Sequence, residues 1–290
     1  MRETVGVVGG GIMGSGIAEV AARSGCDVIL REVDADMCAR ARQRIEASLE
    51  RAVKSAKLRG DDREEALSRL RYVTELDALA DRDVIVEAVV EREEEKLEVF
   101  RALGRLTADR GSVLASNTSS IPIARLAAVT ERPERVIGMH FFNPAPVLPL
   151  VELVPSLLTS DGTVRRAREF ATERLGKQTI LAKDRAGFVV NALLIPYLLA
   201  AIRMLESGFA AAEDVDVAMV AGCAHPMGPL ALADLIGLDT TKAVADSMYA
   251  EFKEPLYAPP PLLLRMVEAG RLGRKSGQGF YDYSSDRPAR

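Results

Sequence analysis

The sequence has 290 residues, of which 48% are hydrophobic and 28% are charged, so it is long enough for two domains with a substantial buried core. Its formal net charge of −4 gives no general attraction for nucleic acid or for an anionic membrane. The cysteines Cys26, Cys38 and Cys223 show neither a disulfide framework nor metal-ligand spacing, and no apolar run is long enough to span a bilayer. We expect a cytoplasmic protein without a metal site.

The first predicted strand, Thr4–Val8, runs directly into Gly9-Gly10-Gly11-Ile12-Met13-Gly14 and then into a helix rich in small residues. Gly9 permits a tight turn, Gly11 lets the backbone approach a pyrophosphate, and Gly14 lets the helix pack closely on the strand. The phosphates of a dinucleotide would bind the free N–H groups at the helix N-terminus. This glycine pattern, in its strand–turn–helix setting, predicts dinucleotide binding.

A second strand, residues 27–32, ends in Glu32. An acid at this position accepts hydrogen bonds from the ribose hydroxyls and repels a 2′-phosphate, which favours NAD over NADP. Arg31 beside it could stack on adenine or tolerate the extra phosphate, so NADP stays as the less favoured cofactor.

A long basic helix is predicted from an N-cap at Asp34 to about Arg59, followed by a shorter helix from Gly60 through Leu70 and an edge strand at Tyr72–Thr74. Its arginines and lysines fit either a solvated surface or a patch that binds substrate phosphates.

Two further buried strands are predicted at residues 83–90 and 112–115. Glu91 opens a helix after the first strand. The polar cluster Ser116-Asn117-Thr118-Ser119-Ser120 follows the second, at the carboxyl end of a parallel strand, where ligands bind in open α/β sheets. An ordinary cap for the following helix is the alternative reading of this cluster.

The apolar run Arg135–Met139 predicts a strand that carries His140 at its end, and Asn143-Pro144 then forces a turn. In the next strand, Leu150–Val154, Glu152 points opposite to its apolar neighbours. A carboxylate near a histidine can fix its tautomer and stabilise the imidazolium, which suits proton transfer. Taken alone, His140 fits a hydrogen-bonded structural histidine better than a catalytic one.

A helix at Asp161–Leu175 and a last strand at Gln178–Ala182 complete an α/β alternation, which predicts a doubly wound, mostly parallel Rossmann-type sheet. From Phe188 onward only helices are predicted, and Asn191 is the polar exception in an apolar run. We therefore expect a dinucleotide-binding domain at residues 1–184 and a smaller all-α C-terminal domain at residues 185–290, which forms a homodimer.

The ordered set of motifs resembles the 3-hydroxyacyl-CoA dehydrogenases, and the length resembles that of the bacterial 3-hydroxybutyryl-CoA dehydrogenases. The motifs are the glycine pattern, the Ser116–Ser120 cluster, Gly138–Pro144, Asp184–Asn191, Pro226-Met227-Gly228-Pro229, Gly237-Leu238-Asp239 and Gly277-Gln278-Gly279-Phe280-Tyr281.

The resemblance implies NAD-dependent, reversible oxidation of a 3-hydroxyacyl-CoA to the 3-oxoacyl-CoA, with a short-chain substrate such as 3-hydroxybutyryl-CoA. It implies that His140 is the general base, that Glu152 orients it, and that Ser119 and Asn191 bind the substrate oxygens. The cofactor contacts that it implies are Gly9, Gly11, Ile12, Met13, Gly14, Glu32, Glu91, Lys96, Asn117, Ser119, Asn143 and Lys275. It places the phosphates of the acyl-CoA partner near Ser48, Lys54 and Lys57.

Some positions depart from the family pattern. Ala192 stands where arginine is common, Pro149 where lysine is common, and Ala224 where glycine is usual. One alternative is therefore a CoA-independent dehydrogenase of a small hydroxy acid such as L-gulonate, although the basic helix favours CoA. A second alternative is a non-catalytic dinucleotide-binding protein, which the joint presence of His140 and Glu152 disfavours.

Overall fold

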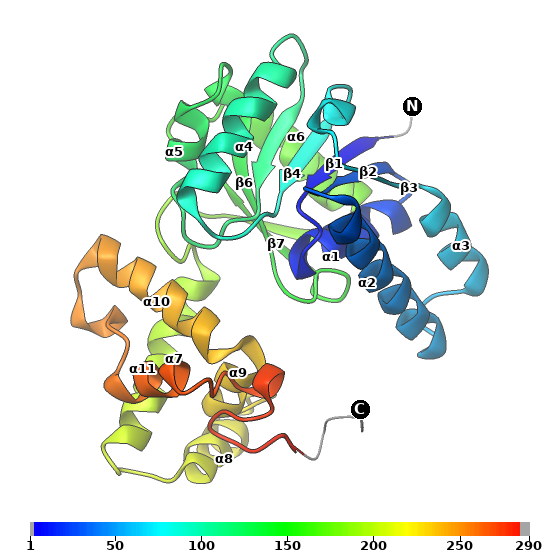
Figure 1. Ribbon diagram of the computed structural model, residues 1–290. Helices are drawn as coiled ribbons and strands as arrows, with labels where there is room; N and C mark the ends of the chain where they lie inside the picture. The colour runs from blue at the N-terminus through cyan, green and yellow to red at the C-terminus, as the bar shows by residue number, and fades with distance from the viewer. Residues whose placement is uncertain (1–2, 285–290) are drawn as a thin grey trace. The chain divides into compact units, whose positions relative to one another are not determined.

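The computed structural model describes residues 3–284, and the chain divides between Arg185 and Ala186 into two compact units (Figure 1). The strands of the first unit are β1 (Thr4–Val8), β2 (Asp27–Arg31), β3 (Leu70–Val73), β4 (Val84–Glu87), β5 (Val113–Ser116), β6 (Val136–Phe141), β7 (Leu150–Val154) and β8 (Gln178–Leu181). Its α-helices are α1 (Ile12–Arg23), α2 (Ala35–Lys54), α3 (Gly60–Ser68), α4 (Glu93–Leu106), α5 (Ile123–Ala128) and α6 (Asp161–Glu169).

The strands form one eight-stranded sheet in the order β3-β2-β1-β4-β5-β6-β7-β8. Every neighbouring pair is parallel except β6 and β7, which are antiparallel. The order runs outward in both directions from β1, so the carboxyl ends of β1 and β4 diverge at a switch point where dinucleotides bind. The predicted doubly wound, mostly parallel sheet is confirmed.

Helices cover both faces of this sheet. Along β6, Ile137 and Met139 point into the core that α1, α2 and α6 help to form. Gly138 and His140 alternate with them and face the other side. On that side α5 packs closely, because a Cβ at Gly138 would lie 3.0 Å from Cδ1 of Ile123. Figure 1 shows α1 to α3 in blue apart from α4 and α5 in cyan and green.

The second unit consists of the helices α7 (Val190–Glu206), α8 (Ala212–Cys223), α9 (Pro229–Ile236), α10 (Leu238–Phe252) and α11 (Pro261–Glu268), as the all-α prediction requires. Leu198, Leu230 and Met248 are fully buried in its core. The buried carboxylate of Asp216 accepts hydrogen bonds from the N–H groups of Leu230 and Ala231, and it thereby caps α9.

Several predicted boundaries were wrong, among them the edge strand, which covers Leu70–Val73 rather than Tyr72–Thr74. The helix that begins after Asp34 ends at Lys54 rather than near Arg59, because Ala56 has a left-handed φ of 55°. The following helix ends at Ser68, since Leu70 pairs with Val28 as the first residue of β3.

The strand predicted over residues 83–90 ends at Glu87. Beyond it, the N–H of Val89 bonds Oε1 of Glu87 at 2.7 Å instead of a neighbouring strand.

Candidate active site

His140 and Glu152 are direct partners in the antiparallel pairing of β6 with β7. Nδ1 of the histidine lies 2.8 Å from Oε2 of the glutamate, and the side chains are 6% and 0% exposed. An ionised carboxylate can only accept, so this contact places the Nδ1 proton on the side of Glu152. His140 is the penultimate residue of β6, so it lies at the end of a strand, as the sequence predicted.

Ser119 reaches the other nitrogen of the same ring. Its Oγ is 3.1 Å from Nε2 of His140. With Nδ1 as donor to Glu152, Nε2 accepts the hydrogen bond of the serine hydroxyl. Glu152, His140 and Ser119 therefore form a connected chain in which Nε2 is basic.

Glu91 holds the loop that carries Ser119. Its Oε1 accepts hydrogen bonds from the Ser119 N–H at 3.0 Å, from the Ser120 hydroxyl at 3.1 Å and from the Thr118 hydroxyl. Partial burial would raise the pKa of Glu91, but Lys96 and these hydrogen bonds outweigh it and leave the pKa below its ordinary value. Glu91 is therefore held as an anion, and it braces the loop beside His140.

Lys96 is one of the most buried residues in the first unit, with its side chain 1% exposed. Its Nζ lies 2.6 Å from Oε1 of Glu87 and 3.2 Å from Oε2 of Glu91. Oε2 of Glu87 in turn accepts a hydrogen bond from the Ser116 hydroxyl at 2.6 Å. Lys96 thus joins the ends of β4 and β5 to the Ser119 loop, and a direct cofactor contact by Lys96 stays a prediction.

Asn117 links the carboxyl ends of two neighbouring strands. Its Oδ1 accepts a hydrogen bond from the N–H of Phe141 at 2.8 Å, which ties the end of β5 to the end of β6. The polar cluster after β5 therefore does more than cap a helix, because its side chains fix the edge of the sheet where His140 lies.

The glycine-rich turn has the geometry that a dinucleotide requires. Gly9 has a φ of +95°, and a Cβ at Gly14 would lie 1.8 Å from the carbonyl oxygen of Gly9, so both positions need glycine for the turn itself. A Cβ at Gly11 would meet no protein atom within 4 Å, and no side chain caps α1 there. The open space and the uncapped helix N-terminus fit a pyrophosphate. Ile12 is 69% exposed, whereas Met13 packs against the core.

Glu32 lies beside this turn and is only 7% exposed. Its Oε1 accepts a hydrogen bond from the Gly10 N–H at 2.6 Å and its Oε2 one from the Val33 N–H at 3.1 Å. A carboxylate has further lone pairs with which to accept ribose hydroxyls. Nε of Arg31 donates to the carbonyl of Thr74 at 2.9 Å, so that guanidinium is anchored on the chain itself.

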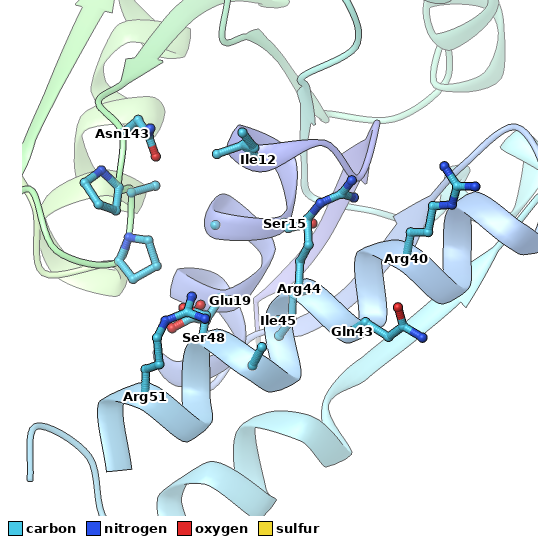
Figure 2. Close-up of a pocket in the computed structure, with 15 residues that line it drawn as sticks. Ile12, Ser15, Glu19, Arg40, Gln43, Arg44, Ile45, Ser48, Arg51 and Asn143 are labelled. Carbon is cyan, nitrogen blue, oxygen red and sulfur yellow. The ribbon is translucent and has the colours of Figure 1, made fainter. Parts of the chain in front are cut away.

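A pocket of about 580 Å³ lies between α1, α2 and the Asn143–Pro146 loop (Figure 2). Ser48 lines it, together with Arg40, Arg44 and Arg51. Three guanidinium groups around one pocket suit a ligand that carries several phosphates.

The structure does not bring the two predicted lysines to this pocket. Lys54 pairs with Glu50 at 2.9 Å, and Lys57 follows the end of α2. Arg44 and Arg51 lie four residues before and three residues after Ser48, so the helical spacing of the sequence already places them on its face.

Glu19 is a pocket residue that sequence reasoning missed. It is 2% exposed on α1, and burial raises the pKa of its carboxyl group, although the Ser48 hydroxyl and Arg23 oppose this shift. Figure 2 shows Arg51, Glu19 and Ser48 together at one end of the pocket. The sequence did offer one indication of Glu19, because it is a single acidic residue among the small residues of α1.

Lys177 is a second missed residue. It is 9% exposed, and its Nζ donates to the carbonyls of Ala145 at 2.7 Å and Leu148 at 2.8 Å. Burial, with a smaller effect of Arg23, lowers the pKa of this lysine. Lys177 therefore fixes the loop that forms one wall of the pocket and carries Asn143.

Asn191 and Lys275 belong to the second unit. Asn191 is in the first turn of α7 and is partly buried. Nζ of Lys275 forms an ion pair with Asp239, 2.6 Å from its Oδ2. Ala224 ends α8 with a left-handed φ of 54°, a conformation that favours the glycine common at this position in the family.

The fold and these contacts define an oxidoreductase that uses a nicotinamide dinucleotide. The family model for the 3-hydroxyacyl-CoA dehydrogenase NAD-binding domain matches residues 4–185, and that for the C-terminal domain matches residues 187–283. The chain belongs to the 3-hydroxyacyl-CoA dehydrogenase family, and the resemblance predicted from its motifs is confirmed.

Individual relatives cover nearly the whole chain. A 3-hydroxybutyryl-CoA dehydrogenase of Mycobacterium tuberculosis is 59% identical over 281 residues, 97% of this chain and 98% of that protein. The human mitochondrial hydroxyacyl-coenzyme A dehydrogenase is 41% identical over 286 residues, 96% of this chain and 90% of that protein. The crystal structure of M. tuberculosis FadB2 has a TM-score of 0.96 at 59% identity and covers 97% of this chain and 99% of its own.

Within residues 3–284, no helix combines the length and the apolar character needed to cross a bilayer. In the same range, no group of three or more histidine, cysteine, aspartate and glutamate side chains is placed to hold a metal ion.

Proposed function

We propose that this chain catalyses the reversible oxidation of a 3-hydroxyacyl-CoA to the 3-oxoacyl-CoA with NAD, and that its substrate has a short acyl chain such as that of 3-hydroxybutyryl-CoA. The observation that carries the proposal is the chain of contacts from Glu152 through His140 to Ser119. It places a basic imidazole nitrogen next to a hydroxyl donor at the ligand-binding edge of the sheet.

In the oxidation, the Ser119 hydroxyl turns from Nε2 of His140 to the substrate oxygen, and the lone pair of Nε2 then accepts the proton of the substrate hydroxyl. Glu152 holds the ring through Nδ1 and offsets the positive charge that forms on it. Ser119 hydrogen-bonds the substrate oxygen and keeps it near Nε2. A nicotinamide dinucleotide held at the Gly9–Gly14 turn would supply the acceptor for the hydride that leaves C3. General-base help of this kind increases the rate by about 10²–10⁴.

The cofactor in this proposal is NAD rather than NADP. Gly9, Gly11 and Gly14 form the turn for the pyrophosphate, and Glu32 accepts the ribose hydroxyls. A buried carboxylate at this position repels a 2′-phosphate. Nε of Arg31 donates to Thr74, which supports a structural role for that residue.

The pocket lined by Arg40, Arg44, Ser48 and Arg51 receives the phosphates of CoA in this proposal. Lys54 and Lys57 do not line this pocket, so their predicted contact with the phosphates is not part of the proposal. The family's motifs support two further roles. Asn191 binds a substrate oxygen, and Asn143 and Lys275 contact the cofactor.

We also propose a homodimer formed through the second unit. Phe209 is 79% exposed, and Val217 and Val220 on α8 are 62% and 41% exposed, so apolar surface is available there. A cytoplasmic location is part of the proposal, and the three free cysteines support it. A role in fatty-acid metabolism follows from the proposed substrate class.

The test is an assay with acetoacetyl-CoA and with free 3-hydroxy acids and L-gulonate, each with both cofactors. We expect turnover of acetoacetyl-CoA with NADH. His140→Ala should lower kcat by at least about 10²-fold while the dissociation constant of NADH stays nearly unchanged.

His225→Ala is the matched control, because His225 contacts the Tyr197 hydroxyl in the second unit. This variant should retain turnover. Activity confined to the free acids would overturn the CoA assignment, and turnover that survives His140→Ala would overturn the proposed base.

A further inference from the structure

The backbone N–H and the backbone carbonyl of Gly10, within the dinucleotide turn, both form hydrogen bonds with side chains. Its N–H donates to Oε1 of Glu32 at 2.6 Å. Its carbonyl oxygen accepts hydrogen bonds from the Ser15 hydroxyl at 2.8 Å and from Nη1 of Arg44 at 2.9 Å. The last of these donors, Arg44, stands 34 residues after Gly10 on α2, so the orientation of Gly10 depends on a separate helix.

Helix α2 rests directly on this turn. A Cβ at Gly10 would lie 2.5 Å from the Cβ of Ala41, so glycine is required there by the approach of the helix. Ala41 and Arg44 are three residues apart and therefore lie on the same side of α2. The contact at Ala41 fixes the distance across which Arg44 reaches the Gly10 carbonyl.

The same arginine lines the pocket that the proposed function assigns to the CoA phosphates. Figure 2 shows its side chain running from α2 toward the start of α1, beside Ser15. A guanidinium carries several N–H donors in a rigid plane, and the bond to Gly10 uses one of them. The others can bind a phosphate at the same time.

We propose that Arg44 is a positioning residue that couples the two ligand sites, so that a phosphate bound in the α1–α2 pocket strengthens the binding of the dinucleotide. The identity of the two ligands rests on the proposed function. Arg44 is exposed and loses side-chain freedom when it bonds Gly10. A phosphate bound to the guanidinium has already restricted the Arg44 side chain, so the bond to Gly10 then costs less side-chain entropy. The Gly10 turn is thereby ordered before the pyrophosphate binds.

Such coupling is reciprocal for equilibrium binding. If CoA lowers the dissociation constant of NADH by some factor, NADH must lower that of CoA by the same factor. We expect a factor of about five or more for the unmodified protein, within the usual range for coupled sites.

The experiment titrates the full chain with NADH, without CoA and with saturating free CoA, by calorimetry. CoA carries the phosphates and has no acyl group to react. The ratio of the two NADH dissociation constants should be about five or more in the unmodified protein and close to one in Arg44→Ala. Arg44→Met retains the aliphatic stem and guards against a packing effect, and it should give the same loss.

Arg40→Ala is the matched control. Arg40 lines the same pocket, and the described hydrogen bonds include none from it to Gly10. This variant should bind CoA more weakly but, at saturating CoA, keep the ratio of the unmodified protein. A ratio near one in the unmodified protein, or an unchanged ratio in Arg44→Ala and Arg44→Met, would overturn the proposal.

Turnover of acetoacetyl-CoA by the unmodified protein separates the two hypotheses. If turnover is present and the ratio does not depend on Arg44, the coupling alone is wrong. If free CoA does not bind and acetoacetyl-CoA is not turned over, the proposed function is wrong as well.

Discussion

The ammonium group of Lys96 lies 2.6 Å from the carboxylate of Glu87, and both side chains are closed to solvent. This pair also reaches Glu91, 3.2 Å from the same nitrogen, and through it the loop of Ser119. A buried charge without its partner is far more unfavourable than an exposed one. The candidate base therefore depends on an ion pair that is remote from it in sequence.

Lys96→Met should lower the free energy of unfolding by about 3–5 kcal/mol, because it leaves Glu87 buried without a cation. Urea denaturation measures this change. Arg125→Met is the matched control, since Arg125 forms an exposed ion pair with Glu93 at 2.8 Å, and its loss should change stability by less than about 1 kcal/mol. Equal effects of the two substitutions would contradict the assignment.

Glu152→Gln should lower kcat by about 10²-fold, because the amide retains the size of the side chain but cannot offset the charge that forms on His140. Steady-state kinetics with acetoacetyl-CoA measures this loss. The dissociation constant of NADH should stay unchanged, which separates an effect on the base from a disturbed fold. An undiminished kcat would show that Glu152 gives the base no support.

Glu91 should contribute to stability in a pH-dependent way. Burial raises its pKa, but Lys96 and the hydrogen bonds outweigh burial, so the pKa is lower in the folded chain than its ordinary value of 4.5. Near this pH the carboxyl group of Glu91 is protonated to a greater extent in the unfolded chain than in the folded chain. The free energy of unfolding therefore decreases as the pH falls. The contribution is complete above pH 4.5 and is lost as the pH falls through the lowered pKa.

Urea unfolding at a series of pH values, from neutral down, measures this effect. Glu91→Gln should give a flatter decline in the acid range than the unmodified chain. Two parallel declines would mean that the pKa of Glu91 is the same in both states.

Ala224→Gly should raise the free energy of unfolding by about 1 kcal/mol, because Ala224 has a left-handed φ of 54° that glycine adopts without strain. Thermal or urea unfolding measures the gain. Ala218→Gly, in the interior of the same helix, should lower stability by about 1 kcal/mol. If both substitutions destabilise the chain, the conformation of Ala224 carries no strain.

The dinucleotide turn could be predicted from the sequence because its parts are contiguous. Gly9, Gly11 and Gly14 act within one strand–turn–helix unit, and a glycine pattern reports directly on backbone geometry. Glu32 was found for the same reason, since it ends the next strand. The alternation in β7 also showed that Glu152 faces away from Val151 and Leu153.

What lay beyond the sequence depends on contacts between distant elements. Glu87 and Lys96 read as ordinary charges at a strand end and in a helix, and only the packing of α4 on the sheet buries them together. Ser48 was predicted near the phosphates, and helical spacing places Arg44 and Arg51 on its face, but only the packing of α2 beside α1 shows that this face lines a pocket. The end of α2 was missed because Ala56 is neither glycine nor proline.

The antiparallel pairing of β6 with β7 makes the length of the chain between them part of the candidate site. Shifting the register of β7 by one residue would turn Glu152 to the opposite face and bring Val151 or Leu153 against the imidazole. A shift by two residues would keep Glu152 on the right face but would place Leu150 or Val154 opposite His140. An insertion or deletion in the intervening loop is therefore compatible with the base only if it leaves the strand register unchanged.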